Sequence, residues 1–81
     1  MIAVEVEVPA LGRRYDFQLE ETSAVRVLIR EMTEVICQKE HCRCANGLQL
    51  SLYDTSRQVR LDPSGTLLQN RIAGGTKLIL V

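Results

Sequence analysis

Aromatic residues and net charge are both scarce in this chain. The 81 residues include no tryptophan and one phenylalanine, and ten basic and ten acidic residues cancel to a formal net charge of zero. Single-stranded nucleic acids bind stacked aromatic side chains in basic grooves, and duplexes attract basic surfaces. The composition therefore argues against nucleic acid as a partner, and it gives no electrostatic reason for binding an anionic membrane.

Long apolar runs are also missing. No stretch approaches the roughly 18 apolar residues that a membrane-spanning helix needs, and Glu5 and Glu7 stand where a secretory signal would be apolar. We therefore expect no direct membrane insertion and a cytoplasmic location. Three cysteines, an odd number, fit free thiols in a reducing compartment.

Alternating apolar and polar residues dominate the first quarter of the chain. They predict strands over 2–8 and 15–19, joined by a turn that contains Pro9, Gly12, Arg13 and Arg14. Hydrophobic residues make up 46% of the sequence, which is typical of a folded domain. The length suits one domain over residues 1–81.

The period changes from two to 3.6 after residue 24. An apolar stripe predicts an amphipathic helix, with Thr22 or Ser23 as its cap. The stripe consists of Val25, Leu28, Ile29, Met32, Val35 and Ile36.

Three further strands are predicted after the helix, over 48–53, 58–61 and 76–81, with one helical turn over 66–72. In the last strand Leu78 and Leu80 lie on one face, and Ile79 and Val81 lie on the other. The economical arrangement is an α+β fold, a mixed five-stranded sheet with one main helix packed on one face.

This element order resembles ubiquitin and the β-grasp fold over essentially the whole chain. The opening M-I-x-V-x-V resembles ubiquitin-like first strands, and LDPSGTLLQNRIAGGTKLILV resembles the end of the ubiquitin-like pattern. The resemblance implies that five residues are core positions: Leu61, Leu67, Ile72, Leu78 and Leu80.

Within the ubiquitin-like set, the length and layout are most similar to the YukD/EsaB family of bacterial type VII (WXG-type) secretion systems. The resemblance implies a non-catalytic accessory or interaction protein. Such a protein binds cytoplasmic parts of the secretion apparatus, needs no cofactor and is not attached covalently to targets. A related interpretation is the isolated ubiquitin-like module of a larger type VII membrane component.

Gly74 and Gly75 raise an alternative of another class. Ubiquitin-like modifiers and sulfur carriers are activated at a free C-terminal diglycine, but six residues follow this pair. A modifier or sulfur carrier would therefore require processing after Gly75. We interpret the pair instead as a turn before the last strand.

The residue types that ligate zinc occur together in one place, at Cys37, His41, Cys42 and Cys44. All four lie within eight residues, whereas structural zinc sites usually join two separated pairs. They are weak candidates for a metal site, and the favoured interpretation is a helix end followed by an exposed loop. Cys37 and His41 also lack an orienting group and an oxyanion hole. We therefore expect no catalytic residue and no enzyme activity.

Apolar side chains on the helix-free face of the sheet are the better functional signal. Ile79 and Val81 point away from the helix, and Tyr53 and Leu11 are expected near them. An exposed apolar cluster marks a protein partner site or a homodimer contact. The predicted partner-binding residues are therefore Leu11, Tyr53, Ile79 and Val81.

Overall fold

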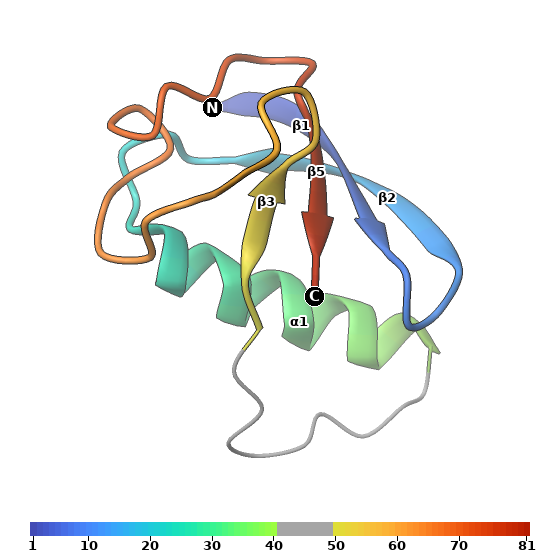
Figure 1. Cartoon of the computed structure of the whole chain (residues 1–81). Coiled ribbons are helices and arrows are strands. Elements are labelled where there is room, and N and C mark those ends of the chain that lie inside the picture. The colour runs from blue at the N-terminus through green and yellow to red at the C-terminus, as the bar shows by residue number, and fades with distance from the viewer. Residues whose placement is uncertain (41–49) are drawn as a thin grey trace.

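The computed structural model describes residues 1–40 and 50–81. Within them one helix lies across one face of a mixed five-stranded sheet (Figure 1), which is the predicted architecture. The elements in chain order are β1 (Ile2–Val8), β2 (Arg13–Leu19), α1 (Val25–Glu40), β3 (Leu52–Asp54), β4 (Val59–Arg60) and β5 (Lys77–Leu80).

The strands lie in the order β2-β1-β5-β3-β4. β1 pairs antiparallel with β2 and parallel with β5, and β5 pairs antiparallel with β3. The final strand therefore lies at the centre of the sheet, hydrogen-bonded on both sides, although it is the last element of the chain.

The core lies between α1 and the sheet face that α1 covers. The five core positions implied by the resemblance are all buried. On the helix, Val25, Leu28, Met32 and Ile36 are buried, but Val35 is 41% exposed. The prediction for Val35 is wrong because this residue lies on the flank of the stripe, one position before Ile36 and rotated away from the sheet.

The start of α1 is capped by a distant segment. The amide of Val25 donates to the carbonyl oxygen of Gly65 at 2.8 Å, and the amide of Arg26 donates to Pro63 at 3.1 Å. The Thr22 hydroxyl donates instead to the Glu20 carboxylate. The predicted side-chain cap is therefore wrong, because the loop at 63–65 satisfies these helix amides.

Some element boundaries differ from the prediction. β2 begins at Arg13, so both arginines belong to the strand and not to the turn. Residues 67–71 form turns, with one helical bond from the Asn70 amide to the Thr66 carbonyl at 3.0 Å, so the predicted helical turn over 66–72 is present but is not extended into a helix. β4 is shortened to two residues after Gln58, whose φ is +54°. The predicted strand over 48–53 begins outside the described residues, and β3 is assigned from Leu52.

Candidate interaction surface

A single row of side chains crosses the sheet on the face opposite α1. Residues directly opposite one another in paired strands point to the same face. Val6 and Leu78 are buried beneath the helix, so their neighbours Glu7 and Ile79 point outward. The strand registers place five residues in this outer row, one from each strand: Arg14, Glu7, Ile79, Tyr53 and Arg60.

The centre of the outer row is apolar and its ends are charged. Ile79 and Tyr53 are half-buried and directly opposite each other. On one side Glu7 forms an ion pair with Arg14 at 3.7 Å, and on the other side Arg60 is exposed at the edge. A small apolar centre with a charged surround has the composition of a protein-binding patch.

The four predicted partner-binding residues do not all lie in this row. Val81 is 49% exposed, and its amide and carbonyl bond the backbone of Ser51. Val81 therefore lies on the same outward face as Ile79, two residues further along the chain. Leu11 is 38% exposed and lies in the β1–β2 turn, where its amide donates to Val8. Its place is outside the paired row.

The charged members of the row were not predicted as site residues. From the sequence, Glu7 is expected in the first strand without a binding role, and Arg14 is expected in a turn. In the sequence, Glu7 follows apolar Val6 and Arg14 precedes Tyr15. This alternation indicates that both charged side chains lie on the outward face of their strands. Their meeting with Ile79, however, depends on the parallel pairing of β1 with β5, which joins the two ends of the chain.

Of the cysteine and histidine cluster, Cys37 alone belongs to the described residues, where it lies in the last turns of α1. It is disulfide-bonded, so the expectation of free thiols is wrong for Cys37. The other candidate ligands, His41, Cys42 and Cys44, lie outside the described residues. Among residues 1–40 and 50–81, no three side chains of the metal-ligating acidic, histidine or cysteine types gather.

The Gly74-Gly75 pair is built into the turn that enters β5. Gly75 has φ +84°, a left-handed conformation that favours glycine, and its amide donates to the carbonyl of Ala3 at 2.7 Å. Thr76 closes the turn by donating its hydroxyl to Ala73 at 2.7 Å. The pair therefore acts as the predicted turn, anchored to the first strand.

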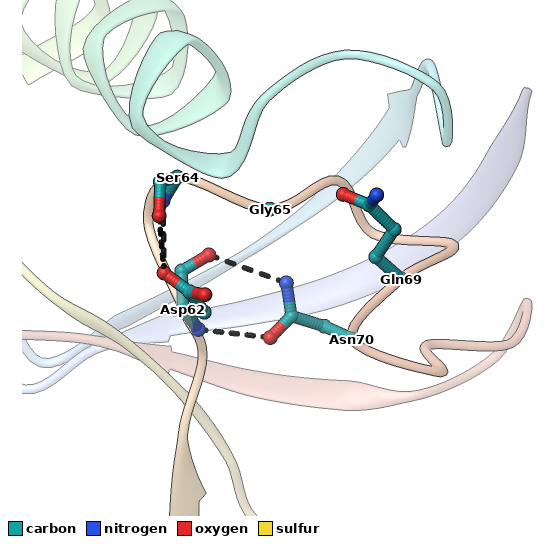
Figure 2. Close-up of a pocket in the computed structure, with 5 residues that line it drawn as sticks. All are labelled: Asp62, Ser64, Gly65, Gln69 and Asn70. Atoms are coloured by element: carbon teal, nitrogen blue, oxygen red, sulfur yellow. Dashed lines mark hydrogen bonds between the residues drawn. The ribbon is translucent and has the colours of Figure 1, made fainter.

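A polar pocket of about 270 Å³ lies beside the loop that caps α1 (Figure 2). Asn70 accepts a bond from the Asp62 amide at 2.8 Å, and its side-chain nitrogen donates to the carbonyls of Asp62 and Thr66. Thr66 and Gln69 form a reciprocal capping box, each accepting from the amide of the other. These polar atoms form hydrogen bonds with one another, so we interpret the residues that line the pocket as stabilising the conformation of the loop.

We expect Asn70→Asp to lower the free energy of unfolding by about 1–2 kcal/mol, because a carboxylate cannot donate to the two carbonyls. Gln69→Glu is the matched control. The only role of the Gln69 side chain in the described bonds is to accept from Thr66, which a carboxylate also does. Urea unfolding of both variants tests this, and equal losses of stability would contradict it.

None of the helical structure in residues 1–40 and 50–81 has the length and apolarity that crossing a bilayer requires.

Comparison with known proteins places this geometry among ubiquitin-like domains. No protein-family model and no curated protein sequence matches the chain. Among solved structures, the EccD5 ubiquitin-like domain from Mycobacterium xenopi superposes with a TM-score of 0.77 at 16% identity, covering 99% of this chain and 91% of that one.

Two further structures agree. The ubiquitin-like domain of Arabidopsis thaliana protein At2g32350 has a TM-score of 0.71 at 18% identity, covering 99% of this chain and 74% of that one. The N-terminal ubiquitin-like domain of the 4931431F19Rik protein has a TM-score of 0.67 at 29% identity, covering 99% and 72%. The chain therefore has the predicted ubiquitin-like β-grasp fold.

Proposed function

We propose that this chain is a non-catalytic, cytoplasmic ubiquitin-like interaction protein of a bacterial type VII secretion system. It binds a cytoplasmic part of the secretion apparatus through the helix-free face of its sheet. The observation that carries the proposal is the outer row, in which half-buried Ile79 and Tyr53 lie between Glu7 and Arg60. The likeness to the EccD5 domain supports the choice of secretion system.

The physical case rests on what this face offers a partner. The side chain of Ile79 is only partly covered by its neighbours, and Val81 is 49% exposed, so a partner can bury more of both. Charged side chains around such a centre set orientation and exclude wrong partners more than they add affinity. The face thus suits a selective contact of modest strength.

A second candidate is supported by a specific observation. The EccD5 structure is a domain of a named protein, and the chain matches nearly all of that domain. The second candidate is therefore the isolated ubiquitin-like module of a larger type VII membrane component. The size of the native polypeptide, measured by immunoblot with an antibody against this domain, separates the two: about 9.1 kDa supports the stand-alone protein.

We expect Ile79→Asp to weaken binding to the secretion ATPase, or to the membrane component's cytoplasmic region, by at least about tenfold in a purified binding assay. In this variant Asp would stand opposite Glu7 of β1, which carries the same charge. Ile79→Lys therefore serves as a second variant, whose charge is opposite to that of Glu7. Both should lose affinity, since both place a charge at the apolar centre.

Leu68→Asp is the control for these variants. Leu68 is 60% exposed and lies in the loop between β4 and β5, outside the row, so its replacement should leave binding unchanged. Binding that survives both Ile79 variants, or that falls equally with Leu68→Asp, would overturn the assignment of this face.

A further inference from the structure

The face of the sheet opposite α1 has an ordered distribution of charge across its strands (Figure 1). In the outer row, acidic Glu7 stands on one side of the apolar pair Ile79 and Tyr53, and basic Arg60 stands on the other side. Neighbouring strands are about 4.8 Å apart, so each charge lies one strand away from the apolar pair. The row therefore presents an acid, two apolar side chains and a base at regular spacing.

Neither of these two charges is fully neutralised within the chain. Among the ion pairs of residues 1–40 and 50–81, none includes Arg60. The pKa of Asp62 is lowered by its Ser64 bonds and, to a smaller extent, by the charge of Arg60. Glu7 lies 3.7 Å from Arg14, but the Glu7 side chain is 42% exposed, and a carboxylate accepts from more than one donor. Glu7 and Arg60 can therefore each take a further partner of opposite charge.

We propose that this face stacks on the same face of a second copy of the chain, about a two-fold axis that runs parallel to the strands and passes between β5 and β3. A two-fold axis makes every contact occur twice. Ile79 then lies against the partner's Tyr53, and Glu7 lies against the partner's Arg60. The two sheets form a sandwich with the helices on its outer sides, and the strands of such aligned sheets cross at about 30°.

Other aligned arrangements oppose like charges or separate the apolar pair. An axis along β5 places Arg14 against the partner's Arg60, and Lys77 against the partner's Lys77. An axis along β3 places Ile79 against the partner's Arg60, and one between β1 and β5 places Ile79 against the partner's Glu7. An axis perpendicular to the strands lays each strand on its own copy, so that the glutamates of β1 oppose one another. The axis between β5 and β3 is the one that matches both the charges and the apolar pair.

The neighbouring residues on this face are compatible with the same axis. Lys77 comes against the partner's Thr55, since the Thr55 amide bonds the Lys77 carbonyl within each chain. Val81 comes against the partner's Ser51 for the same reason, and it is 49% exposed, so the contact covers further apolar surface. The apolar centre is small, and we therefore expect a Kd between about 10 µM and about 1 mM.

The dimer uses the face that is assigned above to the secretion component, so the two partners compete for it. This competition rests on the proposed function, whereas the dimer itself rests on the geometry and charge of the face. Self-association is therefore measured with the chain alone.

Sedimentation equilibrium over a concentration series tests the proposal, with and without reductant so that intermolecular disulfides are recognised. The mean mass should rise from 9.1 kDa toward twice that value. Arg60→Glu and Glu7→Arg should each weaken self-association by about tenfold or more, because each opposes like charges at two symmetric positions. An equal mixture of the two variants should restore association, since each charged contact of the mixed dimer joins a negative to a positive side chain.

Arg26→Glu is the matched control. Arg26 is exposed on α1, on the other side of the sheet, and its replacement changes the net charge of the chain as much as Arg60→Glu does. It should leave self-association unchanged. Arg60→Gln removes the charge at the surface without reversing it, and it should weaken self-association by a smaller factor than Arg60→Glu does.

Restoration in the mixture also shows that both charge-reversed variants are folded, and urea unfolding of each variant alone verifies this. A mass that stays at one chain up to about 1 mM, a mixture of folded variants that does not associate, or an Arg26→Glu variant that loses association as Arg60→Glu does would each overturn the proposal. Because no secretion component is present in this experiment, each of these results leaves the proposed function standing.

Discussion

A chain that ends at Gly75 is expected to be unfolded. Truncation removes β5, which pairs with both β1 and β3, and with it the core side chains Leu78 and Leu80, which are 1% and 2% exposed. Removing each buried leucine side chain costs about 2–5 kcal/mol. A domain of this size is stabilised by only about 4–12 kcal/mol in total. The loss of the two leucines alone is comparable with this total, and the loss of the backbone pairing of β5 adds to it.

Far-UV circular dichroism and amide chemical-shift dispersion of the truncated chain measure this directly. The control ends at Leu80 and lacks only Val81, which is half-exposed. It keeps all of β5 and should unfold cooperatively. Native-like dispersion in the chain ending at Gly75 would show that β5 is dispensable.

The same expectation bears on the modifier or sulfur-carrier alternative. Those functions need a diglycine end that is free while the domain stays folded. Here the Gly75 amide is bonded to Ala3, and the strand that follows is central. Detection by intact mass of a stable chain ending at Gly75, or of an adduct on it, would reverse the preference for a non-covalent interaction protein.

The parts of the fold that follow from local periodicity could be predicted from the sequence. Alternation in residues 2–8 predicts β1, and the 3.6-residue stripe predicts α1 with the observed buried face. The outward direction of Ile79 follows from the burial of Leu78 and Leu80, because neighbouring strand residues point to opposite faces. Each of these inferences uses residues close together in the chain.

The parts that depend on distant segments could not be predicted. The amides of Val25 and Arg26 are satisfied by carbonyls nearly 40 residues away, and no local pattern indicates this bond. The outer row needs the register of five strands, of which the pairing of Glu7 with Ile79 joins the two ends of the chain. The burial of Asp54 was missed for the same reason, since its local sequence, Asp-Thr-Ser, indicates only a turn.

Asp54→Asn is expected to lower the free energy of unfolding at neutral pH by about 2–3 kcal/mol. The Asp54 side chain is 3% exposed and accepts bonds from the Arg57 Nε at 2.7 Å and from the Ser56 amide and hydroxyl at 3.0 and 2.8 Å. An amide at this position has one acceptor oxygen, so its NH2 group would face either the guanidinium or the Ser56 donors.

The acid dependence of the same variant gives a second measurement. Burial raises the pKa of the Asp54 carboxyl, but the bonds from Arg57 and Ser56 outweigh it and hold the pKa below its ordinary value of 3.8. Because the folded-state pKa is the lower one, the charged carboxylate stabilises the fold fully above about pH 5. That stability is lost as the pH falls below 3.8 and through the folded-state pKa. The stability difference between the parent chain and Asp54→Asn should therefore shrink on acidification.

Asp62→Asn is a control that the chain itself supplies. Asp62 heads the same Asp-x-Ser turn and accepts from the Ser64 amide at 3.0 Å and its hydroxyl at 2.7 Å, but it is exposed and none of its described side-chain bonds comes from an arginine. The Ser64 bonds lower the pKa of Asp62 as well, although the Asp62 carboxylate is in contact with water. If the buried arginine bond is the cause, Asp54→Asn loses far more stability than Asp62→Asn. Equal losses would instead assign the effect to the Asp-x-Ser turn, which the two sites share.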